Sequence, residues 1–141
     1  LEFRRVLFRS LRLEAGMPLY GNELSADGSP FAANLGRVVR FDKEGDFVGR
    51  AALEGRPEPE TVLVGLTGGG RRAPRHGYRV LQGDDEVGEI TSGALSPTLG
   101  HPIAMAYVPV RCSEPGTTLS ADIRGRLEPV EVVALPFYQR R

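Results

Sequence analysis

The stretch VLVGLTGGGRRAPRHGYRVLQGDDEVGEIT, residues 62–91, decides the fold class of this chain. It contains three apolar segments rich in β-branched residues, at 62–67, 78–81 and 87–91. The segments between them, GGGRRAPRHG and QGDDE, have the composition of turns. Short strands separated by such turns are typical of antiparallel sheets. We therefore expect three successive antiparallel strands here.

The same pattern continues to the C-terminus, where we expect strands at 103–108, 119–123 and 130–135. Six short strands at this spacing are typical of a small antiparallel barrel or sandwich. The stretch GEITSGALSPTLG, residues 88–100, is nearly uncharged and longer than a hairpin needs. It is either a structural crossover or a loop that packs closely against another surface, because glycine permits near backbone approach.

The first part of the chain reads differently. Leu11–Ala15 has the pattern of the end of a helix or strand closed by Gly16, and RVVRF at 37–41 predicts a strand. Asp46 is placed to cap a helix through FVGRAALEG, and RPEPE at 56–60 is a linker. We therefore predict a short α+β piece at 11–58, lacking a full core of its own, and an all-β domain at 59–141.

The first ten residues, LEFRRVLFRS, carry three arginines and one glutamate. They include no initiator Met, no long apolar core and no small-residue cleavage site, so a secretory signal is not expected. We interpret residues 1–10 as a non-native leader and leave them out of the fold prediction.

Composition narrows the class of protein. The chain has 141 residues, of which 40% are hydrophobic and 26% charged, as in soluble globular proteins. No apolar run approaches the roughly 18 residues of a membrane span. The formal net charge is zero, which favours neither nucleic acid nor a membrane surface as a partner. The single cysteine, Cys112, excludes an internal disulfide and a cysteine-based metal cage.

Common catalytic motifs are missing from the sequence. There is no phosphate-binding loop and no G-x-S-x-G, and His76 and His101 lack a partner at ligand spacing, so no metal is expected. Arg71, Arg72 and Arg75 form the one basic cluster together with His76. Such a cluster is usually a solvated hairpin tip. The alternative is contact with an anion or an acidic partner.

Glu14 lies between leucines and just ahead of a glycine in LRLEAGMPLYGNEL, residues 11–24. A buried carboxylate costs several kcal/mol unless it finds donors or a cation. The position therefore predicts either an ion pair, for example with Arg12, or a ligand that offers hydrogen-bond donors.

Six segments resemble one family in the order in which they occur: LRLEAGMPLYGNEL, DFVGRAAL, RHGY, GEITSGALSPTLG, AMAYVP and LPFY. From residue 11 onward the chain resembles the C-terminal portion of the aminomethyltransferases, the T-proteins of the glycine cleavage system. The resemblance implies an α+β remnant of the folate-binding domain at 11–58, followed by an all-β C-terminal antiparallel barrel domain. It also implies transfer of a one-carbon unit from aminomethyl-lipoyl H-protein to tetrahydrofolate with release of ammonia.

The resemblance assigns two substrate-binding residues. Glu14 matches the family glutamate that contacts the pterin, where a carboxylate can accept two parallel N–H bonds. Lys43 is the nearest basic residue before the D-F-V-G-R motif and is a candidate contact for a folate carboxylate. The family's catalytic aspartate lies in an N-terminal part that precedes this match. We therefore expect the chain to be inactive alone, and to belong to the bacterial cytoplasm or the mitochondrial matrix.

Two other functions remain open. Sarcosine and dimethylglycine dehydrogenases carry a similar folate-binding module at their C-terminus. A non-catalytic folate-binding protein is the third possibility, although the cysteine-containing motif of such relatives is missing near Glu14–Gly21. If Arg71, Arg72 and Arg75 contact an acidic partner, H-protein is one candidate.

Overall fold

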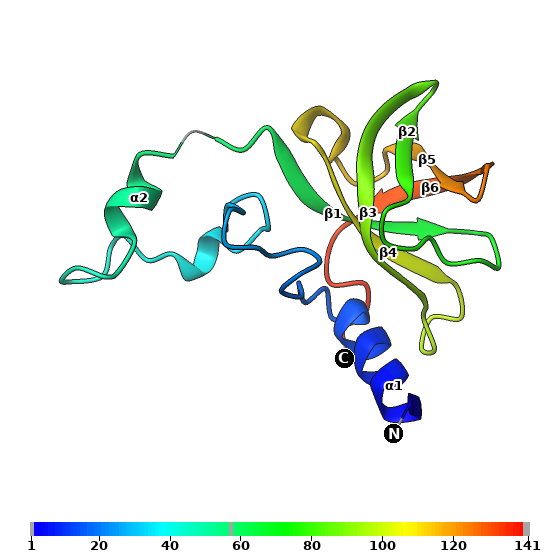
Figure 1. Ribbon diagram of the computed structural model, residues 1–141, viewed down its shortest axis with the longest axis horizontal. Helices are drawn as coiled ribbons and strands as arrows, with labels where there is room; N and C mark the ends of the chain where they lie inside the picture. Colours follow the sequence, from blue (N-terminus) through cyan, green and yellow to red (C-terminus); the bar gives the residue numbers. More distant parts are fainter. Residues whose placement is uncertain (1, 57, 140–141) are drawn as a thin grey trace.

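The computed structural model describes residues 2–56 and 58–139. Figure 1 shows a β-barrel with one helix beneath it and an irregular arm that extends to one side. In chain order the elements are α1 (Glu2–Glu14), the 3-10 turn η1 (Gly36–Val38), α2 (Arg50–Glu54), β1 (Thr61–Gly68), β2 (Arg79–Gln82), β3 (Asp85–Leu95), β4 (Pro102–Pro109), the 3-10 turn η2 (Val110–Cys112), β5 (Thr118–Ile123) and β6 (Arg126–Val133).

The six strands close into a barrel in the order β1-β4-β3-β2-β5-β6, and every neighbouring pair is antiparallel. Pairing of β1 with both β4 and β6 closes the ring. Closure leaves no unpaired edge on which another strand could add. The expected antiparallel barrel of about six short strands is confirmed, and its closed ring rules out the sandwich.

Two hydrophobic clusters hold this architecture together. The larger one fills the barrel and draws alternate residues from all six strands, among them Leu66, Ile90 and Leu119. The smaller one lies outside the barrel, where Leu13 of α1 packs on Ile103 and Met105 of β4. Leu13 is therefore buried by the barrel.

The arm differs from the sequence prediction in two places. Residues 37–41 form no strand; η1 occupies 36–38 and is followed by irregular backbone, because this β-branched segment has no neighbouring strand to pair with. The second helix begins at Arg50, after Gly49 at φ +90°, rather than at a cap on Asp46. The Asp46 carboxylate accepts a hydrogen bond only from the next residue's N–H, so it cannot cap α2.

Strand β3 is longer than predicted and takes in the first part of the stretch read as a loop. A Cβ at Gly88 would lie 2.1 Å from the carbonyl oxygen of Tyr107, and one at Gly93 would lie 1.9 Å from that of Pro74. Only glycine tolerates such approaches. Both glycines therefore pack against neighbouring parts of the same barrel, and the end of the stretch joins β3 to β4.

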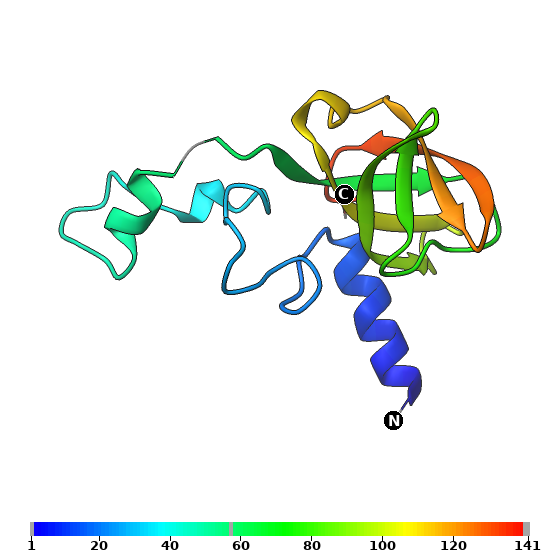
Figure 2. The same ribbon diagram turned by 45° about the horizontal axis from the view of Figure 1, so that its top comes forward.

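Helix α1 runs without a break from Glu2 to Glu14. Residues 2–10, which we interpret as a leader, are thus continuous in structure with the predicted helix end at 11–15. Figure 2 shows the helix projecting from below the barrel, with its C-terminal end against it. Glu14 is the last residue of this helix, so contact of the helix end with the barrel fixes the position of Glu14.

Candidate functional site

Glu14 is the last residue of α1, and its carboxylate meets the loop that follows β3. Its Oε1 accepts hydrogen bonds from the Ser96 hydroxyl and from the Thr98 backbone N–H, the latter at 3.0 Å. Its Oε2 accepts one from the Thr98 hydroxyl at 2.8 Å. Only 3% of Glu14 is exposed. The buried carboxylate is therefore held by hydroxyl and backbone donors, and the ion pair expected as one alternative is not formed with Arg12.

The protonation of Glu14 follows from these contacts. Burial is the largest single influence and by itself raises the pKa of a carboxyl group, but the hydrogen bonds from Ser96 and Thr98 together lower the pKa of Glu14 below its ordinary value. The side chain is therefore ionised at neutral pH. A carboxylate offers about four acceptor positions, of which three are occupied here.

The C-terminal segment returns to the same place. The backbone N–H of Tyr138 donates to the Glu14 carbonyl at 3.0 Å. Leu135 and Phe137 pack over Gly65 of β1, where a Cβ would lie 2.8 Å from a methyl group of Leu135. Tyr138 itself is 44% exposed beside this helix end. The site thus joins three segments that are far apart in the sequence.

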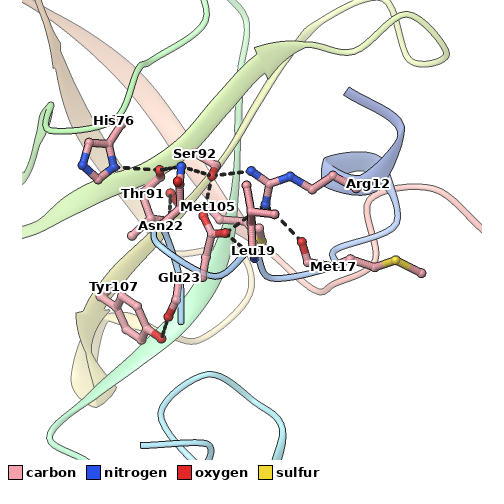
Figure 3. A network of polar contacts seen from close by, with 10 residues as sticks. All are labelled: Arg12, Met17, Leu19, Asn22, Glu23, His76, Thr91, Ser92, Met105 and Tyr107. Carbon is pink, nitrogen blue, oxygen red and sulfur yellow. Dashed lines mark hydrogen bonds and ion pairs between the residues drawn. The ribbon is translucent and has the colours of Figure 1, made fainter. Parts of the chain in front are cut away.

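A second polar cluster fixes the segment after α1 to the barrel (Figure 3). The Glu23 carboxylate accepts hydrogen bonds from Arg12 Nη1 at 2.9 Å, from the Leu19 N–H at 2.8 Å and from the Ser92 hydroxyl at 2.5 Å. Arg12 Nη2 donates to the same hydroxyl at 2.6 Å. The side chains of Arg12 and Glu23 are 10% and 0% exposed, so this is a buried ion pair.

The network extends along β3 and β4. Asn22 donates to Ser92 at 3.1 Å and to the Thr91 carbonyl at 2.9 Å, and His76 Nδ1 lies 2.9 Å from the same carbonyl. The Tyr107 hydroxyl donates to the Glu23 carbonyl at 2.7 Å. Residues 12–23 are therefore fastened to the barrel by buried polar contacts. They hold the end of α1, and with it Glu14, in a fixed orientation.

The structure does not bring Lys43 to Glu14. Lys43 is exposed and lies between η1 and α2, in the arm that both ribbon views show extending away from the barrel. Sequence reasoning found Glu14 but missed its partners, Ser96 and Thr98. The sequence did contain a signal for them. Ser96 and Thr98 form an uncharged S-x-T pair in a loop, and their hydroxyls are donors that a buried carboxylate needs.

The described residues contain no group of three His, Cys, Asp or Glu side chains that could hold a metal ion. Within the same part of the chain, each helix is too short or too polar to cross a membrane. The site can accept a further hydrogen bond from a donor at the ionised, oriented Glu14 carboxylate.

Residues 62–139 match the family described as the glycine cleavage T-protein C-terminal barrel domain. The chain belongs to this family. The matched residues comprise the whole closed barrel except the first residue of β1, together with the C-terminal segment that returns to Glu14.

Comparison of nearly the whole chain with individual relatives supports the same family. The chain is 68% identical over 134 residues to an aminomethyltransferase from Saccharopolyspora erythraea, covering 93% of this chain and 36% of that protein. It is 64% identical over 138 residues to one from Streptomyces coelicolor, covering 94% of this chain and 37% of that protein. The chain thus spans little more than a third of the relatives' length.

A solved structure shows the same arrangement. The crystal structure of the glycine cleavage system aminomethyltransferase T from Bartonella henselae superposes with a TM-score of 0.86 at 33% identity. The match covers 94% of this chain and 38% of that one. It therefore extends well beyond the barrel family match at 62–139 and includes most of the segment that carries Glu14.

Proposed function

We propose that this chain is the C-terminal part of an aminomethyltransferase of the glycine cleavage system. The observation that carries the proposal is the identity of 68% to the Saccharopolyspora erythraea enzyme over nearly the whole chain. The reaction would move the one-carbon unit from the aminomethyl-lipoyl arm of H-protein to tetrahydrofolate and release ammonia. Tetrahydrofolate is here a co-substrate, and H-protein is the protein partner.

Within this function we propose that Glu14 binds the pterin ring. The carboxylate is ionised, oriented by three hydrogen bonds and left with about one acceptor position. One pterin N–H fits that position directly. A parallel pair of N–H donors would fit if the Thr98 hydroxyl turned away from Oε2, which a hydroxyl can do by rotation about its Cα–Cβ bond.

Lys43 remains our candidate for a folate carboxylate. It is exposed and forms no ion pair within the described residues. A lysine can act there as a point charge on a flexible stem. Because Lys43 lies on the arm, its contact with folate would be made in the longer protein, where the arm has further surface to pack against.

The chain alone would be inactive, since it spans about a third of the length of its aminomethyltransferase relatives. Positioning of two substrates supplies much of the rate in such transfers, and a partial cavity cannot provide it. The bacterial relatives support the cytoplasm as the place where it works.

A chimera tests this proposal. Residues 11–141 would replace the matching part of the Saccharopolyspora erythraea enzyme, and methylenetetrahydrofolate formation would be measured with aminomethyl-lipoyl H-protein. We expect activity within about tenfold of the parent enzyme, because the exchanged part is 68% identical. The enzyme lacking this part is the control. A folded chimera without transfer activity would refute the proposed function.

A further inference from the structure

We propose that an arginine-lined cavity between α1, the β1–β2 connection and the β5–β6 turn binds a small polyanion carrying two or more carboxylate or phosphate groups. The cavity measures about 660 Å³. Its lining includes Arg71, Arg72 and Arg75 from the β1–β2 connection and Arg124 from the β5–β6 turn. Arg9 of α1 also lines it but lies in the segment that we interpret as a leader, so the site is assigned to the other four arginines. This inference does not depend on the proposed transferase activity.

All charged side chains that line the cavity are positive. No aspartate or glutamate lines the cavity, although the chain as a whole has zero formal net charge. Arg12, Arg40, Arg50 and Arg79 each pair with a carboxylate. Within the described residues the four arginines assigned to the site form no such pair. Guanidinium groups bind carboxylate and phosphate in a bidentate fork, so convergent arginines without a counterion fit a multivalent anion.

The arginine loop is fastened to the barrel, unlike a freely solvated hairpin tip. Pro74 is buried, and its carbonyl lies so close to Gly93 that a Cβ there would clash at 1.9 Å. His76 Nδ1 bonds the Thr91 carbonyl at 2.9 Å, and the Gly77 N–H donates to the Ile90 carbonyl at 2.9 Å. The backbone at 74–77 is thus held against β3, while the arginine side chains themselves are exposed and open to a ligand.

Arg124 supplies an independent observation. Among the residues that the structure describes, it is one of two non-glycine residues at positive φ, at +57°, in a two-residue hairpin turn with Gly125 at +80°. Such turns favour Asn-Gly, because both positions need φ above zero. An arginine placed against this preference lines the cavity, and its Nε lies 3.4 Å from the Tyr78 hydroxyl. Backbone strain of this kind is concentrated at functional positions.

A neighbouring cavity of about 370 Å³ shares Arg75 and Gly93 with the first. It is lined by Arg12, whose side chain is nine-tenths buried. The Nε of Arg12 is a buried nitrogen without a hydrogen-bond partner in the described part of the chain. An unsatisfied buried donor is costly unless an acceptor reaches it. A bound anion that extends into this second cavity would provide one.

Isothermal titration of the full chain at low salt, with pyrophosphate, citrate and acetate as ligands, tests the site. We expect saturable one-to-one binding of pyrophosphate or citrate, and binding of monovalent acetate at least about tenfold weaker. Tighter binding of pyrophosphate would identify phosphate as the natural group, and tighter binding of citrate would identify carboxylate. Failure of both polyanions to bind would overturn the proposal.

Two variants and one control make the test specific. Arg124→Gly relieves the positive φ, so the fold should be kept while affinity falls about tenfold. A combined Arg71→Gln and Arg75→Gln variant should weaken binding about a hundredfold. Arg126→Gln, two residues from Arg124 and outside the lining, is the matched control and should change affinity less than twofold. Equal losses in Arg124→Gly and Arg126→Gln would contradict the site.

Discussion

The Thr98 hydroxyl donates a 2.8 Å hydrogen bond to the Glu14 carboxylate across 84 residues of sequence. With the Ser96 hydroxyl and the Thr98 N–H, it fastens the loop after β3 to the end of α1. The folate-facing residue proposed here is therefore also a structural residue that joins α1 to the barrel. Effects of changing it on stability and on ligand binding have to be measured separately.

Glu14→Gln should destabilise the chain by about 1–3 kcal/mol, because an amide nitrogen replaces one of two buried acceptor oxygens. The amide oxygen can keep the bonds from Ser96 and the Thr98 N–H, but these bonds lose their charge, and the Thr98 hydroxyl must turn from donor to acceptor. Urea denaturation followed by circular dichroism measures the change. Glu89→Gln, at an exposed position of β3 outside the ion pairs, is the control and should leave the unfolding free energy unchanged.

The same contacts predict a pH dependence. Because the pKa of Glu14 is lower in the folded chain than its ordinary value, the unfolded chain takes up a proton first as the pH falls. The stabilisation from Glu14 is complete above the ordinary pKa and is lost as the pH falls through the folded pKa. Arg79 also lowers the pKa of Asp122, so both groups act in this acidic window.

The difference between the native chain and Glu14→Gln isolates the Glu14 contribution. Urea midpoints measured from neutral to acidic pH should converge for the two proteins as the pH falls. Midpoints that stay parallel over this range would show that folding does not lower the pKa of Glu14.

The buried pair of Arg12 and Glu23 should matter far more than the exposed pair of Arg40 and Asp42. Glu23→Gln leaves the Arg12 guanidinium buried without a carboxylate, at a cost of about 3–5 kcal/mol. Asp42→Asn, in a solvated pair, should leave the unfolding free energy within error of the native value. Similar losses in both variants would disprove the burial of the first pair.

Gly93→Ala tests the close approach of the arginine loop to β3. A Cβ there would lie 1.9 Å from the Pro74 carbonyl oxygen, so the loop must shift, and we expect a loss of about 1–3 kcal/mol. Gly69→Ala in the same connection meets nothing within 4 Å and needs no positive φ, and it should be neutral. Amide hydrogen exchange at Gly77 would report the loop directly, with faster exchange in Gly93→Ala alone.

Much of the barrel was predictable from sequence. Each strand is an apolar, β-branched segment, and turn residues such as glycine and aspartate separate it from the next one. Strands 62–67 and 78–81 were placed within a residue or two. The strand predicted for RVVRF at 37–41 is not formed. A strand needs a partner strand to pair with, and β propensity alone does not provide one.

The site was predictable only in part, for a physical reason. Glu14 was found because a carboxylate among leucines is costly unless it is satisfied. Its donors, Ser96 and Thr98, are common loop residues whose role depends on how the barrel closes, and closure is a long-range property. Likewise, Arg124 could not be linked to Arg71 and Arg75 until the strand order placed their turns around one cavity.

The central claim, that Glu14 binds the pterin, is tested most directly by tetrahydrofolate affinity in the chimeric enzyme. Glu14→Gln should raise Kd by about 10- to 150-fold, the 1.5–3 kcal/mol of a charged hydrogen bond, at a temperature where the protein stays folded. Thr98→Val, which loosens the same contact but keeps the carboxylate, should retain affinity within about threefold. An unchanged Kd in Glu14→Gln, or an equal loss in Thr98→Val, would contradict the account.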